Sequence, residues 1–241
     1  MVAAAPRLQP SILPLRALPE REIVAQAISY PKELVTMRVA VIGIGNVGST
    51  LSEKLESAGH EVVVAASTEE SAERAAEDLN CEPAATPAEA AEKAEAVVLA
   101  VPADALGEVA QELRGHVSGK PVVDVSNGPM AVQEGRSLAE TVQEQLPEAR
   151  VVKAFNTAFA SRMADPTFDG GLSLDGFLAG DDPEAKKVVG RLVGDVGFEP
   201  LDIGELKMAR VLEGMAWVNI SLNMANSWPW RSGWKLLRQE A

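Results

Sequence analysis

Short apolar runs alternate with longer stretches of mixed apolar and charged residues from Met37 onward. Runs rich in Val and Ala without polar alternation are typical of strands buried on both faces of a parallel sheet. Five such runs are RVAVI (38–42), EVVVA (61–65), AVVLAV (96–101), PVVDV (121–125) and RVVKAF (150–155). A further short strand is expected near residues 82–85. Strands that alternate with helices predict an α/β fold, a doubly wound Rossmann-type parallel sheet with helices on both faces.

Helix-capping residues place several of the connecting helices. The first helix is expected over residues 46–57, because Gly59 follows it and suits a left-handed C-terminal cap. In the stretch TPAE, Thr86 can cap a helix, Pro87 suits its first position and Glu89 completes a capping box.

The pattern changes after Asn156. We expect a strand at 174–180, a helix that Asp182 caps before Pro183, a short strand at 199–203 and a long apolar helix over 205–223. The predicted organisation is an extension (1–36), a dinucleotide-binding domain (37–156) and a small α+β acceptor or dimerisation part (157–241). Apolar residues surround nearly the whole of 211–224, which predicts a buried helix and a homodimer contact.

The stretch VAVIGIGNVGST carries three glycines directly behind the first predicted strand. Gly43 permits a tight turn, Gly45 allows close approach of a pyrophosphate, and Gly48 allows the following helix to pack on the strand. The N–H groups near Asn46 and Val47 would then face the phosphates. The alternative is a glycine turn that binds nothing.

The end of the second strand indicates which dinucleotide binds. NAD-specific sites usually place an acidic residue there, whereas this chain has Ala65, Ala66, Ser67 and Thr68. Hydroxyl groups and open space favour the 2′-phosphate of NADP over NAD. Ser67 could instead cap the next helix with Glu70, and both roles are compatible.

Loops that follow the later strands are expected to line the nicotinamide: 101–104, 126–129 and 155–159. Asn127 and Asn156 are candidate cofactor contacts, although Asn127 before Gly-Pro also suits a turn. Lys153 is a candidate catalytic residue or a strand residue that reaches solvent. Otherwise no catalytic side chain is assigned, because the cofactor carries the chemistry of hydride transfer.

Composition excludes several classes. The formal charge of −13 argues against a nucleic-acid partner, since phosphate binding needs clustered basic residues. A single cysteine, Cys81, excludes an internal disulfide, and with two histidines no Cys/His zinc site can form, so no metal is expected. We expect a soluble, cytoplasmic protein, because no apolar run approaches the roughly 20 residues of a membrane span. The proline-containing residues 1–36 are expected to be an extension, or a targeting or oligomer-contact segment.

From Met37 to about Leu237 the sequence resembles the NADP-dependent coenzyme F-420 reductase family, also called deazaflavin-dependent NADP oxidoreductases. The resemblance extends to a wider set of dinucleotide-binding reductases that includes the cytosolic domain of metalloreductases. Its most distinctive segments are VVKAFNT and the run from AGDDPEAKK to LEGMAW, because the glycine loop occurs in many unrelated enzymes.

This resemblance implies a Rossmann domain with a small C-terminal part, often dimeric, that passes hydride between NADP and a deazaflavin such as coenzyme F-420. By position it assigns Gly43, Gly45, Asn46 and Val47 to the pyrophosphate, Ser67 and Thr68 to the 2′-phosphate, and Val101 and Pro102 to the nicotinamide side. The family commonly has Ser-Arg where this chain has Ser67-Thr68, so the phosphate lacks an adjacent cation.

Two other functions stay open. One is a β-hydroxyacid dehydrogenase or pyrroline-carboxylate-type reductase that uses Lys153 and Asn156, and the other is a non-catalytic NADPH-binding sensor. The chain's four tryptophans, Trp217, Trp228, Trp230 and Trp234, either wall a flat acceptor or pack the C-terminal helix and a dimer seam.

Overall fold

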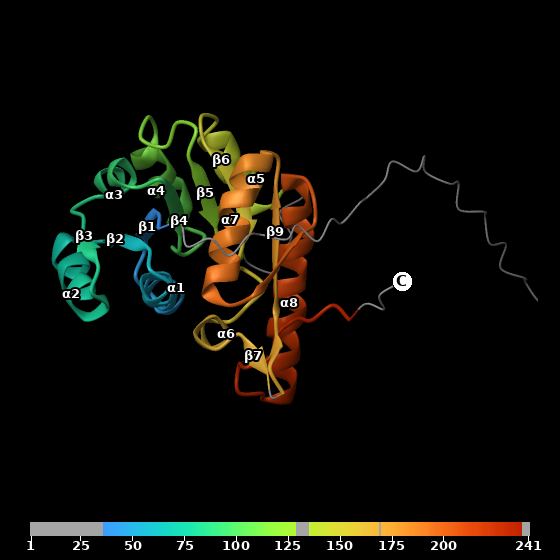
Figure 1. Ribbon diagram of the computed structural model, residues 1–241. Helices are drawn as coiled ribbons and strands as arrows, with labels where there is room; N and C mark the ends of the chain where they lie inside the picture. The colour runs from blue at the N-terminus through green and yellow to red at the C-terminus, as the bar shows by residue number, and fades with distance from the viewer. Residues whose placement is uncertain (1–35, 129–134, 169, 238–241) are drawn as a thin grey trace, which may run out of the picture.

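The computed structural model describes residues 36–128, 135–168 and 170–237, and the predicted extension lies outside this range except for residue 36. Its main sheet has eight strands in the order β10-β9-β6-β5-β4-β1-β2-β3 (Figure 1). The six strands from β6 to β3 are parallel and follow the Rossmann order. They are β1 (Arg38–Ile42), β2 (Glu61–Ala65), β3 (Glu82–Pro83), β4 (Ala96–Leu99), β5 (Pro121–Asp124) and β6 (Arg150–Ala154). The predicted fold class is confirmed.

Two strands of the C-terminal part extend this same sheet. β9 (Asp175–Gly180) pairs antiparallel with β6, and β10 (Glu199–Asp202) pairs parallel with β9. A separate hairpin, β7 (Thr167–Phe168) and β8 (Leu172–Ser173), follows the short helix α6 (Ala160–Ala164). Strands on both sides of residue 157 therefore share one sheet, and a domain boundary there stays a prediction.

Alternate residues of each central strand enter two separate cores. Val39 and Val41 face a core with α1 (Asn46–Ser57), α2 (Glu69–Leu79) and α7 (Pro183–Val196). Ala40 and Ile42 face the other core with α3 (Pro87–Lys93), α4 (Leu106–Leu113) and α5 (Leu138–Gln145). Both faces are buried, which explains why these strands read as continuous apolar runs.

Most predicted boundaries agree with the structure, and the differences are informative. α1 spans the predicted residues, and Thr86 and Asp182 cap α3 and α7 as expected. The runs 96–101 and 150–155 end early as strands, at Leu99 and Ala154, so their last residues belong to loops. These loop residues remain apolar because they line the cleft or fill the core, which a sequence pattern does not distinguish from strand.

The C-terminal helix lies beside β9 at the end of the sheet away from β3 (Figure 1). A 3-10 turn (Leu206–Met208) precedes α8 (Ala209–Asn226). Arg210 of α8 binds Glu140 of α5, with Nε 2.7 Å from the carboxylate. Partial burial alone would raise the pKa of Glu140, but hydrogen bonds from Arg210 and Ser137 outweigh it and hold that pKa at about 2. This ion pair therefore joins α8 to the α5 face of the sheet at ordinary pH.

One side of α8 remains uncovered. Val211, Val218 and Leu222 lie on one side of the helix, seven and four residues apart, and are 44–49% exposed, so the helix is not buried on all sides within one chain. We call these three residues the α8 stripe. Over the described ranges, no helix combines the length and apolar character needed to cross a membrane.

The turn between β1 and α1 is closely packed against itself. A Cβ atom on Gly48 would lie 1.8 Å from the carbonyl oxygen of Gly43. Gly43 has a φ of +95°, and a Cβ there would lie 2.6 Å from the Ala100 carbonyl oxygen. Only glycine fits at both positions, so the motif is a packing requirement as well as a candidate binding loop.

We predict that Gly48→Ala destabilises the fold by about 3 kcal/mol or more, the upper end of what overpacking costs, because the obstacle is backbone. Denaturant unfolding measures this change. Gly194→Ala in α7 is the matched control, since a Cβ there meets nothing within 4 Å and alanine favours a helix. Equal stability of the two variants would contradict the observed packing.

Candidate functional site

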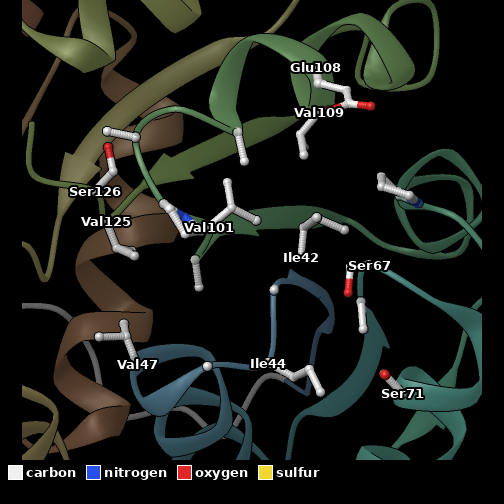
Figure 2. A pocket seen from close by; sticks show the side chains of 18 of the residues that line it. Ile42, Ile44, Val47, Ser67, Ser71, Val101, Glu108, Val109, Val125 and Ser126 are labelled. Carbon is white, nitrogen blue, oxygen red and sulfur yellow. The ribbon is translucent and has the colours of Figure 1, made fainter.

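A cleft of about 800 Å³ lies beyond the carboxyl ends of the central parallel strands. The loops after β1, β2, β4 and β5 form its walls, together with the first turns of α2 and α3 and one side of α4. In Figure 2, Val47, Val125 and Ser126 lie at one end and Ser67 and Ser71 at the other. We call these the Ser126 end and the Ser67 end. The size lies within the roughly 300–1,000 Å³ of small-molecule sites.

The glycine turn supplies backbone donors to the middle of the cleft. Gly45 is the N-cap of α1 with no side-chain cap from the described residues, and α1 has no acidic residue in its first turn. Gly45, Asn46 and Val47 line the cleft. The first N–H groups of a helix lack intrahelical partners and attract anions. A Cβ on Gly45 would meet no atom within 4 Å. The packing of the protein therefore does not require glycine here, and the absent side chain leaves open space in the cleft.

The Ser67 end is built on the start of α2. Ser67 and Ser71 line the cleft, whereas Thr68 does not. Thr68 is the N-cap of α2, because its Oγ1 accepts from the Ser71 N–H at 3.2 Å. The alternative in which Ser67 caps this helix is therefore wrong. Either hydroxyl satisfies a capping pattern, and the point where the helix starts decides between them.

The charge of the cleft is acidic. Glu108 and Glu112 of α4 are the only ionisable side chains among the described lining residues. Arg74, the first basic residue after Ser67 along the chain, pairs with Glu70 at 3.0 Å and is absent from the lining. Sequence reasoning missed Ser71, Glu108 and Glu112. For Ser71 a signal existed, since it lies in the first turn of a helix that begins directly after a parallel strand.

At the Ser126 end the two predicted asparagines form a pair. The Asn127 side-chain amide donates to the Asn156 carbonyl at 2.8 Å, and the Asn156 amide donates to Asn127 Oδ1 at 3.0 Å. Asn127 lines the cleft, whereas Asn156 is buried behind it and is not a lining residue. Phe155, the residue before Asn156, has a φ of +62°, a conformation that is costly for a bulky residue.

Lys153 does not reach the cleft or solvent. Its side chain has no exposed surface, and its ammonium lies 2.8 Å from Asp124, 2.8 Å from Glu213 and 2.6 Å from the Ser126 carbonyl oxygen. Neither sequence-based interpretation of Lys153, as a catalytic residue or as a strand residue reaching solvent, agrees with this burial. The lysine is a structural cation that three acceptors bind.

Of the remaining predicted residues, Gly43, Val101 and Pro102 line the cleft, whereas Gly48 does not. The loop 155–159, predicted to line the nicotinamide, also lies outside the lining. Val125 after β5 is a further lining residue.

The tryptophans do not line the cleft. Trp230 packs edge-on against Phe159, with the two ring centroids 5.3 Å apart. Trp234 packs with Leu212 and Phe177. For these two rings the structure agrees with packing of the C-terminal segment.

A doubly wound sheet whose first turn directs helix N–H groups into a cleft at the strand ends defines a Rossmann-type dinucleotide-binding protein. The family model described as NADP oxidoreductase, coenzyme F420-dependent, matches residues 38–128. The F420-dependent NADP reductase of Methanothermobacter marburgensis is 34% identical over 214 residues, which are 79% of this chain and 94% of that protein. The chain therefore belongs to the F420-dependent NADP reductase family, and it is an NADP-dependent oxidoreductase.

Other comparisons agree with this assignment. A crystal structure of a protein from Arthrobacter sp. FB24, provisionally described as an F420-dependent NADP reductase, has a TM-score of 0.76 and 29% identity. The match covers 84% of this chain and 100% of that one. Metalloreductase STEAP3 of Rattus norvegicus is 30% identical over 200 residues. The match covers 82% of this chain and 38% of the rat protein. The resemblance found in the sequence is confirmed.

We predict that Gly45→Val lowers affinity for NADPH at least tenfold, because the side chain occupies the open space beside the helix N-terminus. The fold should lose no more than about 1 kcal/mol, since valine is a poorer N-cap than glycine. Titration of NADPH and denaturant unfolding measure the two effects. Gly107→Ala in α4, outside the lining, should weaken neither NADPH binding nor the fold, and a Gly45→Val protein with parental affinity would refute the role of this loop.

Proposed function

We propose that the cleft binds NADP(H) with its pyrophosphate at the N-terminus of α1 and its nicotinamide at the Ser126 end. The cleft volume, the uncapped helix start and the open space at Gly45 support this placement. The proposed cofactor contacts are Gly43, Gly45, Asn46, Val47, Gly48, Ser67, Thr68, Val101, Pro102, Asn127 and Asn156. Asn156 acts through Asn127 in this proposal, because it lies behind that residue.

The 2′-phosphate is assigned to the Ser67 end. Ser67 offers a hydroxyl there, and Thr68 contributes through the helix start that it caps. Within the described part of the lining no residue supplies a cation, and charge-assisted hydrogen bonds are about twice as strong as neutral ones. We therefore expect NADPH to be preferred over NADH only modestly, which parallel titrations of the two cofactors measure.

The reaction we propose is hydride transfer between the nicotinamide and a deazaflavin, coenzyme F420. In one direction NADPH, one proton and the oxidised deazaflavin give NADP⁺ and the reduced deazaflavin. The observation that carries this choice is the Ser126 end itself. Val47, Val101, Pro102 and Val125 line it, and the two ionisable lining residues belong to α4. Such a wall orients two planar partners and excludes water, and its described residues offer no acid or base.

A substrate that needs a proton from a side chain fits the Ser126 end less well. The hydroxyacid or pyrroline-carboxylate reading needs a lysine that reaches the reacting atoms, and Lys153 has no exposed surface. A planar two-electron acceptor needs no proton from a side chain, because bulk solvent supplies the proton after hydride transfer, when the acceptor leaves the cleft. The structure thus supports the deazaflavin over an imine or a hydroxyacid.

The test is turnover with a panel of acceptors. We expect NADPH to bleach the absorbance of oxidised coenzyme F420, and no turnover with a pyrroline carboxylate or a β-hydroxyacid. Parallel assays contain FMN, FAD and a soluble quinone. Activity with the imine or hydroxyacid alone would replace the proposal by that reductase class, and NADPH binding without any turnover would indicate a sensor.

We also propose that the chain forms a homodimer through the α8 stripe and acts in the cytoplasm. Three large apolar side chains on one side of a helix are costly to leave in water, since burial of apolar surface is worth roughly 25 cal/mol per Å². The family resemblance and the lone cysteine are consistent with these two assignments.

Light scattering at micromolar concentration should give the mass of two chains. Leu222→Glu should give one chain, because it places a charge in the apolar contact. Gln111→Glu, which adds the same charge at an exposed position of α4, should remain dimeric. A monomeric parent protein would contradict the proposed contact.

A further inference from the structure

The loop after β5 is bound to α8 at two points. Glu213 and Trp217 stand four residues apart on α8, so they lie on one side of the helix. Glu213 reaches the loop through the Lys153 ammonium, whereas Trp217 donates a hydrogen bond to the loop directly. Both end on backbone carbonyl groups of the loop that lines the Ser126 end of the cleft.

The Lys153 contact holds the start of the loop. An ammonium has three donors, and here they go to Asp124 of β5, to Glu213 of α8 and to the Ser126 carbonyl. Asp124 also accepts from the Ser126 N–H at 2.9 Å and from its hydroxyl at 2.6 Å. Glu213 accepts in addition from the Leu138 N–H at the start of α5, at 2.9 Å. Ser126 is therefore bound on its N–H, its carbonyl and its side chain.

The Trp217 contact holds the loop at Gly128. Its indole Nε1 donates to the Gly128 carbonyl at 3.0 Å. Between the two bound carbonyl groups lies Asn127, whose side chain is paired with Asn156. Val125, Ser126 and Asn127 all line the cleft, whereas Glu213 and Trp217 do not.

We propose that Glu213 and Trp217 are positioning residues: α8 holds the loop 125–128 in the conformation that receives the nicotinamide half of NADP(H). This inference rests on the proposed placement of the cofactor. Without these contacts the loop has to be ordered when the cofactor binds, and the ordering entropy weakens binding of that half alone. The Ser67 end, built on β2 and α2, does not depend on α8.

The test compares two ligands on two matched variants. Trp217→Phe keeps an aromatic ring but removes the N–H donor. Trp234→Phe makes the same chemical change where Nε1 is buried without a partner among the described residues, so it removes no hydrogen bond. The ligands are NADPH and 2′-phospho-ADP-ribose, which has every part of NADPH except the nicotinamide.

Calorimetric titration should show that Trp217→Phe weakens NADPH about three- to tenfold, as expected for one lost hydrogen bond, and 2′-phospho-ADP-ribose less than twofold. Trp234→Phe should leave both affinities unchanged. Equal weakening of both ligands by Trp217→Phe would reveal general damage, and unchanged NADPH affinity would show no coupling; either overturns the inference.

If Trp217→Phe fails to fold, Glu213→Gln replaces it with the same ligands and the same expected difference. Gln keeps an acceptor for Lys153 but removes the charge. A parent protein that binds neither ligand would refute the proposed cofactor site itself, which separates that failure from failure of the positioning role.

Discussion

A lysine ammonium with no access to water connects the sheet to the C-terminal helix. Lys153 belongs to β6, and its ammonium lies 2.8 Å from the carboxylate of Asp124 in β5 and 2.8 Å from that of Glu213 in α8. Removing one partner of a buried ion pair typically costs about 3–5 kcal/mol, because the remaining charge stays in a low-dielectric interior. Glu213 also binds the start of α5. These contacts fix α8 to the sheet and to α5, and the Ser126 carbonyl of the loop after β5 binds the same ammonium.

The same arrangement removes the lysine from the chemistry of the cleft. With Lys153 occupied by three acceptors, the Ser126 end keeps valine and proline side chains and an asparagine. Hydride transfer depends on orientation and on excluding water, and an apolar wall supplies both. The ionisable side chains of the described cleft lining, Glu108 and Glu112, both belong to α4. Structure and charge together favour a reductase that binds by shape and backbone donors.

The positions that sequence predicted well are those that local backbone geometry decides. Gly43 adopts a φ of +95° and Gly48 touches the Gly43 carbonyl, so the turn needs glycine at both places whatever surrounds it. The caps at Thr86 and Asp182 depend on residues within one turn. The capping residue of α2 was placed at Ser67 in one interpretation and lies at Thr68, because two adjacent hydroxyl residues satisfy the same pattern.

By itself the sequence determined the fold class, the glycine turn, most element boundaries and the family. Only the tertiary structure decided that Lys153 is buried, that Asn156 lies behind Asn127, and that Trp217 holds a loop and does not wall the cleft. The partners explain the difference: Lys153 and Glu213 are 60 residues apart, and Trp217 and Gly128 are 89 apart. Short-range patterns record what the backbone prefers over a few residues. The partner of a side chain depends on which distant segment the packed sheet and helices bring to it.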